Sequence, residues 1–243
     1  MKGNTKGLFV TGTDTEVGKT HIAAGLLHLL AQDGSRTAGL KPVAAGLCEV
    51  AGRLVNEDVQ TLQAASSLPL TDAEVGPYQF ATACAPHIAA ALEGRRIERA
   101  TVLAHARALA DRCDWLVVEG VGGWRVPLSA VDGSEPRWDS ADLAEDLALP
   151  VVLVVGLRLG CISHARLTAE SVQRRGLPLI GWVANCIDPA MAQAEDNLAA
   201  LRQTLAAEHR IGCLGVVPWL TPPAPAAVAA HLDRAAVLAA LSR

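Results

Sequence analysis

The sequence predicts an α/β protein with a doubly wound, mostly parallel sheet and helices on both faces. Short apolar runs rich in β-branched residues alternate with helical stretches along the 243 residues, a pattern typical of parallel sheets that are covered on both sides. A glycine-bounded loop joins the first apolar run to the first helix. Because 51% of the residues are hydrophobic, the chain can bury one large core, and we expect a single domain over residues 1–243.

The first expected strand, residues 8–10, leads directly into the loop VTGTDTEVGKT at residues 10–20. The helix after the loop ends near Gly34 and has one apolar face, formed by Ile22, Leu26, Leu29 and Leu30. A strand, a glycine-bounded loop and a helix N-terminus in immediate succession are typical of a phosphate-binding loop, or P-loop. We therefore expect a fold of the P-loop NTPase type.

Each part of this loop suits a phosphate group. Backbone N–H groups of residues 16–20 can converge on phosphate oxygens at a helix N-terminus, Lys19 adds a full positive charge, and the hydroxyl of Thr20 can bind Mg²⁺. Gly12 lies one residue further from Gly18 than in the usual pattern, so the loop is longer by one residue. The alternative is an ordinary strand-to-helix turn in which the Lys-Thr pair is accidental.

The later elements continue the alternation of strands and helices. Strands are expected at residues 36–41, 115–118, 151–155, 179–184 and 214–217. Helices are expected at residues 57–65, 101–112, 142–147, 163–175 and 191–208, and an Ala-rich helix after Pro222, Pro223 and Pro225. Residues 129–138 mix Gly, Pro and charged residues, and we expect a mobile loop there.

In sheets of this kind, ligands bind outside the carboxyl ends of the strands, so the residues just past each strand are informative. Beyond the P-loop, these residues are Lys41, residues 119–123, residues 156–163, Asn185, Pro218 and Trp219. A lysine, a carboxylate, glycine-rich backbone and an amide at one rim are the parts of a site for nucleotide chemistry.

Several of these residues fit phosphoryl transfer. Glu119 stands where a strand-end carboxylate normally completes the metal coordination begun by Thr20, and the glycines within residues 120–123 let the backbone approach a ligand. Lys41 can neutralise a developing anion. The alternative for Glu119 and Lys41 is a solvated strand end. Asp58 lies at a helix start, and its spacing alone favours an N-terminal capping role.

Asn185 and residues 156–163 each have a ligand-binding and a structural interpretation. Asn185 can present its amide to a base edge, since an amide both donates and accepts hydrogen bonds, or it is an ordinary turn residue. Residues 156–163 place a glycine-bearing loop before a helix N-terminus, which suits a substrate carboxylate. The alternative for this segment is a simple strand-to-helix connection.

Composition and charge exclude several functional classes. A net charge of −4 and a pI of about 6.0, without runs of like charge, give no electrostatic footprint for nucleic acid or an anionic membrane. The longest apolar stretch, residues 148–157, is well short of the roughly 20 residues that span a bilayer. Residues 8–10 are too short for a signal-peptide core. The six cysteines have no zinc or redox spacing, so we expect reduced thiols and a cytoplasmic location.

Seven segments, in order across most of the chain, resemble the dethiobiotin synthetase family. They are GTDTEVGKT (12–20), AGLKPVA (38–44), PHIAA (86–90), EGVGGW (119–124), PVVLVVGLRLGCISHA (150–165), GWVAN (181–185) and VPWL (217–220). The longer glycine spacing of the P-loop is itself a feature of that family. The resemblance implies a doubly wound, mostly parallel sheet and a homodimer.

The resemblance also implies an activity. Members of the family are ATP-dependent, Mg²⁺-dependent cyclo-ligases of biotin biosynthesis, which convert 7,8-diaminononanoate and CO₂ to dethiobiotin, ADP and phosphate. A substrate amine captures CO₂ as a carbamate, the γ-phosphoryl group passes to it as a carbamic-phosphoric anhydride, and the second amine closes the ring. Charge on the phosphates and the carbamate would be offset by Lys19 and Lys41.

Matching positions carry over the family's other site residues. The metal would be held by Thr20, Asp58 and Glu119. The nucleotide would contact these three residues and Glu16, Val17, Gly18, Lys19, His21, Gly120, Val121, Gly122, Asn185, Pro218, Trp219 and Leu220. The substrate would contact Lys41, Ala45, Gly160, Cys161, Ile162 and Ser163, with residues 160–163 reached from the partner subunit of the homodimer.

The chain departs from the family at three positions. Ala45 stands where a serine or threonine is usual, so a hydroxyl contact to the carbamate is lost. Cys186 replaces a frequent acid after Asn185, and Pro225 stands roughly where some members place a glutamate on the nucleotide. These changes leave the base selectivity open. Residues 130–138 look like an insertion without an assigned role.

Two other functions remain as alternatives. A nucleotide switch of the partition or septum-positioning type shares this fold, but such proteins usually carry a second lysine early in the P-loop, where this chain has Thr13, Asp14 and Thr15. An amide-forming relative that uses glutamine ammonia would need a glutaminase domain, for which the sequence leaves no room. No nucleic-acid or membrane partner is expected.

Overall fold

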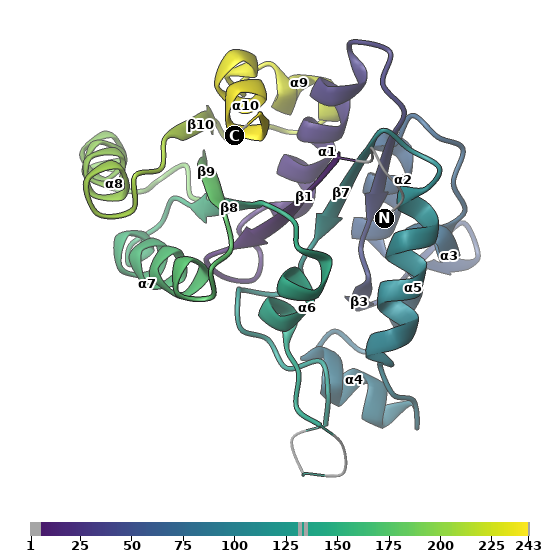
Figure 1. The fold of residues 1–243 in the computed structure, drawn as a ribbon. Helices are drawn as coiled ribbons and strands as arrows, with labels where there is room; N and C mark the ends of the chain where they lie inside the picture. Colours follow the sequence, from purple (N-terminus) through teal and green to yellow (C-terminus); the bar gives the residue numbers. More distant parts are fainter. Residues whose placement is uncertain (1–5, 131–132, 134–135, 243) are drawn as a thin grey trace.

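The centre of the fold is a parallel sheet with the strand order β10-β9-β8-β1-β7-β2 (Figure 1). The structure is a computed structural model that describes residues 6–130, 133 and 136–242. The strands are β1 (Lys6–Gly12), β2 (Thr37–Leu40), β7 (Trp115–Glu119), β8 (Val151–Gly156), β9 (Leu179–Asn185) and β10 (Cys213–Val217). Each strand pairs in parallel with its neighbours. The predicted parallel sheet is therefore confirmed.

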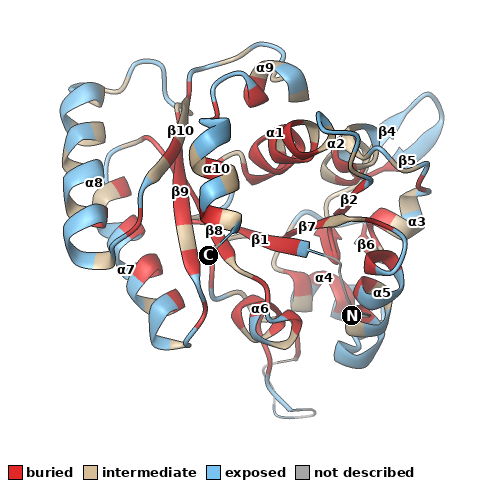
Figure 2. Cartoon of the chain, turned by 45° about the horizontal axis from the view of Figure 1, so that its top comes forward, coloured by how far each residue is buried: buried red, intermediate tan, exposed pale blue. Residues whose placement is uncertain are grey.

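Helices cover both faces of this sheet (Figures 1 and 2). One face carries α1 (Lys19–Ala31), α2 (Glu57–Ala65), α9 (Pro225–Ala229) and α10 (Arg234–Leu241). The opposite face carries α5 (Arg99–Ala110), α6 (Ser140–Leu147), α7 (Cys161–Arg174) and α8 (Ala194–His209). Right-handed crossovers place α1 opposite α5, α6, α7 and α8, because the chain moves toward β2 after β1 and back toward β10 after β2.

The sheet is buried on both sides (Figure 2), and every residue of β8 is inaccessible to solvent. Continuous apolar strands of this kind produce a core on each face of the sheet. The direction of strand order reverses beside β1, and such a reversal opens a ligand-binding crevice at the carboxyl ends of the strands. The P-loop begins at this point.

Several short elements escaped the sequence-based prediction. They are the strands β3 (Val43–Ala45), β4 (Cys48–Val50), β5 (Arg53–Val55) and β6 (Tyr78–Phe80), and the helices α3 (Asp72–Val75) and α4 (Pro86–Leu92). Strands β3 and β6 form a parallel pair, and β4 and β5 form an antiparallel hairpin. Elements this short contain too little periodicity to be recognised along the chain.

Two expectations need correction. The Ala-rich C-terminal region is two helices, α9 and α10, because the chain turns between them to pair Leu232 with Gly215. The ends of the expected mobile loop are fixed, since Trp138 is buried and its N–H donates to Oγ of Ser129 at 2.9 Å. Residues 131, 132, 134 and 135, within this loop, lie outside the described residues.

No helix in the described part of the chain is both long and apolar enough to cross a bilayer. The six cysteines all lie within it, and none of them forms a disulfide.

Candidate functional site

The P-loop follows β1 and ends at Gly18, the residue that caps α1. Gly18 has a φ of +84°, and Glu16 also has a left-handed backbone, with a φ of +58°. A Cβ atom at position 18 would lie 2.1 Å from Nδ2 of Asn185. Position 18 therefore requires glycine for its backbone and for its lack of a side chain. Left-handed residues in such a turn are typical of backbone concavities that bind anions.

Lys19 is buried beside the loop that it follows. Its Nζ atom donates a hydrogen bond to the carbonyl oxygen of Asp14 at 2.9 Å. Burial and, to a smaller extent, the positive charge of Lys41 together lower the pKa of Lys19 to about 8. An anion bound at the loop would oppose both effects, so this ammonium group is stabilised most when a phosphate is present.

Thr20 meets two carboxylates that are far from it in the sequence. Its hydroxyl oxygen lies 2.7 Å from Oδ1 of Asp58 and 2.9 Å from Oε1 of Glu119. Glu119 is the last residue of β7 and is only 1% exposed, whereas Asp58 is partly open to solvent. The structure therefore brings together the three residues expected to hold a metal, and the solvated alternative for Glu119 is wrong.

Asp58 is available to this cluster because another residue caps α2. Oδ1 of Asn56 accepts a hydrogen bond from the N–H of Val59 at 3.2 Å, and Nδ2 of Asn56 donates to the carbonyl oxygen of Gly46 at 2.8 Å. The capping role that spacing alone favoured for Asp58 is therefore wrong. Asn56 fixes the first turn of α2, and this turn directs Asp58 toward Thr20.

Lys41 is buried at the centre of the carboxylate cluster. Its Nζ lies 2.9 Å from Oδ2 of Asp58 and also pairs with Oε1 of Glu119. With 4% of its surface exposed, Lys41 is not a solvated strand end. Burial alone would lower its pKa, but the two carboxylates outweigh burial and raise it.

The two carboxylates respond differently to the same lysine. For Glu119, burial raises the pKa, and Lys41 opposes this shift without reversing it. For Asp58, burial also acts to raise the pKa, but Lys41 and the hydrogen bond from Thr20 bring it below its ordinary value. Asp58 therefore holds its negative charge more readily than Glu119 does.

The cluster fits a magnesium ion. Oε2 of Glu119 is buried without a hydrogen-bond partner, so one carboxylate oxygen has an unused electron pair that a cation would satisfy. Mg²⁺ prefers hard oxygen ligands and is usually held by one or two carboxylates together with substrate phosphates and water. No group of three His, Cys, Asp or Glu residues with metal-binding geometry occurs among the described residues. Thr20, Asp58 and Glu119 instead form a partial set of the kind that a nucleotide completes.

The glycine-rich segment after β7 packs directly on the first half of the P-loop. Gly122 has a φ of +61°, and a Cβ atom at Gly123 would lie 3.7 Å from Cα of Asp14. The carbonyl oxygen of Gly120 lies 3.5 Å from Nζ of Lys41. The glycines thus allow close approach of two backbones, as expected for residues 120–123.

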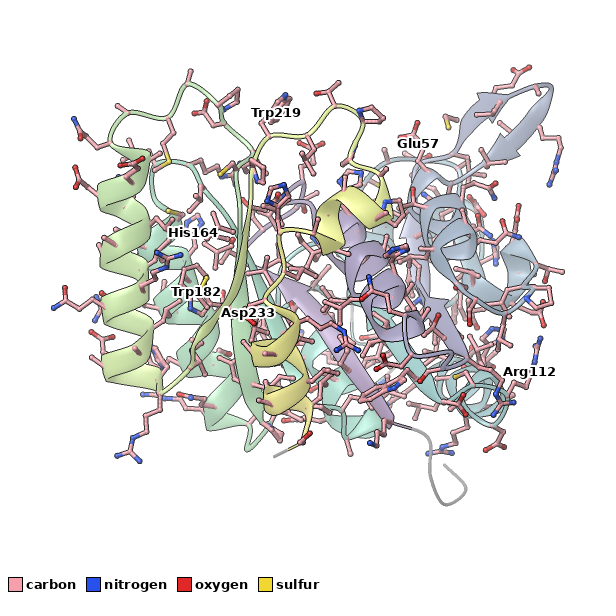
Figure 3. All side chains as sticks on the ribbon, turned by 90° about the horizontal axis from the view of Figure 1, so that it is seen from above. Glu57, Arg112, His164, Trp182, Trp219 and Asp233 are labelled. Atoms are coloured by element: carbon pink, nitrogen blue, oxygen red, sulfur yellow. The ribbon has the colours of Figure 1, made fainter. Side chains whose placement is uncertain are left out.

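Asn185 lies against the P-loop on the other side. Its Nδ2 donates to the carbonyl oxygen of Val17 at 3.0 Å, so at least one amide hydrogen supports the loop itself. The N–H of Cys186 donates to the carbonyl oxygen of Val217 at 2.9 Å, which sets residues 218–220 beside Asn185. Figure 3 shows Trp219 on the loop after β10, and 57% of this indole is exposed. His21 also lies beside this part of the loop, since a Cβ atom at Gly18 would be 4.0 Å from its Nδ1, and burial lowers the pKa of His21.

Residues 160–163 are not close to Lys41 within one chain. They follow β8, whereas Lys41 follows β2, and β1 and β7 lie between these two strands. Because neighbouring strands are about 4.8 Å apart, the two segments begin three strand spacings from each other. Gly160 caps α7 with a φ of +93°, Cys161 is buried, and Ser163 is exposed. Ala45 ends β3, a short strand that begins two residues after Lys41, and is half-buried. The expected substrate residues thus form two separate groups in one subunit.

One charged pair at the loop was missed by the analysis of the sequence. Nη2 of Arg158 pairs with the carboxylate of Asp14, although the two residues are 144 positions apart. Arg158 follows β8 and Asp14 follows β1, and these two strands are neighbours. The pair could have been predicted only by knowing that β1 and β8 are neighbours in the sheet. The sequence of either segment does not contain that information.

A parallel sheet, a P-loop at its switch point and a carboxylate cluster opposite the loop define a P-loop nucleotide-binding protein. A family model described as an AAA domain, AAA_26, matches residues 6–227. The chain therefore belongs to the AAA_26 family of P-loop NTPases, which includes dethiobiotin synthase.

Solved structures share the fold at low sequence identity. The septum site-determining protein MinD of Pyrococcus horikoshii, solved with Mg-ADP, has a TM-score of 0.57 and 13% identity over 97% of this chain and 96% of that chain. The cell division ATPase MinD of Pyrococcus furiosus has a TM-score of 0.54 and 14% identity over 96% and 97%. A MinC:MinD complex of Aquifex aeolicus has a TM-score of 0.50 and 12% identity over 97% and 96%. At these identities the likeness extends to the fold alone.

Proposed function

We propose that this protein is an ATP- and Mg²⁺-dependent cyclo-ligase that converts 7,8-diaminononanoate and CO₂ to dethiobiotin. The observation that carries the proposal is the buried ammonium group of Lys41, which pairs with both carboxylates opposite the P-loop. An ATPase that transfers phosphate to water requires the loop and the metal. A second buried cation at this place suits a reaction in which the phosphoryl acceptor is itself an anion.

The proposed reaction has three steps. An amine nitrogen of the substrate forms a C–N bond to CO₂ and loses a proton, which leaves a carbamate. A carbamate oxygen attacks the γ-phosphorus of ATP, the bond to ADP breaks, and a carbamic-phosphoric anhydride forms. The second amine then attacks the carbonyl carbon and loses a proton, and phosphate leaves as the ureido ring closes. Every intermediate is anionic, so the site must offset negative charge throughout.

The residues of the site match this requirement. Lys19 lies on the P-loop side and would balance the γ-phosphate and the departing phosphate, while Lys41 lies on the β2 side and would balance the carbamate. Mg²⁺ held by Thr20, Asp58 and Glu119 would supply further neutralisation of the phosphate oxygens. Ala45 offers no hydroxyl, so its contact with the carbamate would be through backbone N–H or water.

A homodimer would complete the substrate site. Residues 160–163 lie three strands away from Lys41 in one subunit, so a partner subunit would bring its own copy of this loop to the substrate carboxylate. Leu159 is 93% exposed and Leu167 is 62% exposed, on either side of this loop. Large exposed apolar side chains around a functional loop are typical of an interaction surface.

The decisive experiment supplies purified protein with ATP, Mg²⁺, bicarbonate and 7,8-diaminononanoate. We expect ADP release that requires the diamine, together with dethiobiotin detected by mass spectrometry. Nucleotide binding without diamine-dependent ADP release would overturn the ligase proposal while leaving the P-loop assignment intact.

The competing function is a nucleotide switch of the MinD type, because MinD proteins share the fold. A switch of that type would hydrolyse ATP without the diamine and would respond to a macromolecular partner. ADP release that is stimulated by DNA or anionic lipid, and unaffected by the diamine, would favour the switch.

A further inference from the structure

Asp14 places a carboxylate at the first half of the P-loop, where a triphosphate would bind. Oδ1 of Asp14 accepts a hydrogen bond from the N–H of Thr15 at 2.8 Å, and its backbone carbonyl accepts one from Lys19. About half of the Asp14 side chain is exposed. A fixed negative charge beside a phosphate site repels the ligand unless another group compensates for it.

Arg158 lies where such compensation is needed. Its guanidinium group pairs with Oδ2 of Asp14 from the loop after β8, while Lys19 is held on the opposite side by the carbonyl oxygen of the same residue. Asp14 also abuts the backbone of Gly123. The lengthened first half of the P-loop is therefore fixed by contacts with Lys19, Arg158 and the glycine-rich segment after β7.

We propose that Arg158 is a charge-compensating positioning residue of the nucleotide site. Its guanidinium group cancels the charge of Asp14, so that the loop can accept a triphosphate, and it holds the extra length of the loop against the end of β8. Nucleotide switches usually supply positive charge from a lysine early in the loop, whereas here it comes from Arg158 in the loop after β8. The inference rests on the nucleotide site of the proposed function and does not require carbamate chemistry.

The test measures ATP affinity by isothermal titration calorimetry in the absence of diamine. Arg158→Gln is expected to weaken ATP binding by about three- to ten-fold, because a half-exposed charge contributes modestly. Arg158→Lys should retain most of the affinity. The double variant Asp14→Asn with Arg158→Gln should recover the affinity lost in Arg158→Gln, since no charge then remains to be compensated.

Two further arms separate compensation from a purely structural role. The defect of Arg158→Gln should shrink in 0.5 M salt, about five times ordinary buffer strength, because salt screens repulsion between exposed charges. Arg166→Gln is the matched control, since Arg166 pairs with Glu208 at similar exposure away from the P-loop, and it should leave ATP affinity unchanged.

Three results would overturn the proposal. They are a double variant as weak as Arg158→Gln alone, a defect that does not change with salt, and an equal defect in Arg166→Gln. Failure of the ligase proposal has a different signature, because ATP would still bind while diamine-dependent product formation would be absent.

Discussion

The hydroxyl of Thr20 lies 2.9 Å from Oε1 of Glu119, although 99 positions separate the two residues in the sequence. One residue begins the helix after β1, and the other ends β7, the strand beside β1. Because parallel neighbours end at the same edge of a sheet, this pairing of strands brings Thr20 and Glu119 together in the carboxylate cluster. Asp58 joins the cluster from α2 and is kept there by Lys41 and Thr20.

Lys41→Met is expected to reduce dethiobiotin formation by at least about 100-fold, because it removes a buried cation that would stabilise charge in the transition state. ATP affinity should stay within a few-fold of the parent value, since Lys19 and the loop backbone remain. Glu119, which loses its counter-ion, would take up a proton more readily and so avoid an unpaired buried charge. Product formation and ATP titration measure the two effects.

Lys6→Met is the control for this prediction, because Lys6 begins β1 far from the carboxylate cluster and its ammonium group lies over the ring of Trp115. The control should keep full activity. A Lys41→Met protein that retains more than a tenth of the activity would contradict the assigned role.

Gly18→Ala is expected to abolish nucleotide binding. It should also lower the free energy of unfolding by more than the amount that backbone strain alone would cause. The new Cβ atom would lie 2.1 Å from Nδ2 of Asn185, at a position with a φ of +84°. Gly34→Ala isolates the strain, since Gly34 has a φ of +80° and no atom within 4 Å of the added Cβ. Gly34→Ala should lower the free energy of unfolding by roughly 1 kcal/mol. Equal losses in the two variants, measured by chemical denaturation, would rule out the clash.

ATP affinity should fall as the pH rises through about 8. The pKa of Lys19 is lowered to about 8 by burial and by Lys41, so the unliganded loop loses this charge above that pH. Lys19→Met should bind ATP weakly and without this pH dependence. Titrations with ATP between pH 7 and 9.5 test the prediction, and a flat profile in the parent protein would contradict it.

Linkage adds a second consequence for Lys19. The pKa of an unperturbed lysine is 10.5, so between pH 8 and 10.5 the unfolded chain holds a proton on Lys19 that the folded chain has released. The contribution of Lys19 to the free energy of unfolding therefore rises with pH across this window. Urea denaturation at several pH values should show a steeper rise in the parent protein than in Lys19→Met.

Asn56→Ala is expected to weaken Mg²⁺-dependent ATP binding and to cost about 1 kcal/mol of stability. Asn56 caps α2 and also anchors the carbonyl oxygen of Gly46, so its loss would free the turn that carries Asp58. Asp233→Ala is the matched control, because Asp233 caps α10 by accepting from the N–H of Ala236. The control should lose similar stability and leave the Mg²⁺ dependence unchanged. Loss of Mg²⁺ dependence in both variants would contradict the argument.

The sheet could be predicted from the sequence because its strands are buried on both sides and are therefore continuous apolar runs, as in residues 151–155. Strand ends were displaced by one or two residues, and the hairpin of β4 and β5 was missed. Val50 and Leu54 are exposed in this hairpin. Because most of the hairpin is exposed, burial does not impose on its sequence the alternation of apolar and polar residues that indicates a strand.

Much of the candidate site could be predicted in the same way. The P-loop is a contiguous segment, and Glu119 and Lys41 follow strands that were recognised. Asp58 was the exception, since a helix-start acid next to Asn56 has the same appearance whether it caps the helix or binds a metal. The structure excluded the capping role, because the N–H of Val59 donates to Oδ1 of Asn56 instead.

The sequence by itself determined the class of fold, the phosphate-binding loop and the residue types at the rim, because each depends on neighbours along the chain. Only the tertiary structure decided that Lys41 is buried between Asp58 and Glu119, and that Arg158 meets Asp14. Those contacts depend on which strands lie side by side. Strand order results from packing of the whole sheet and leaves no periodic signal in any one segment.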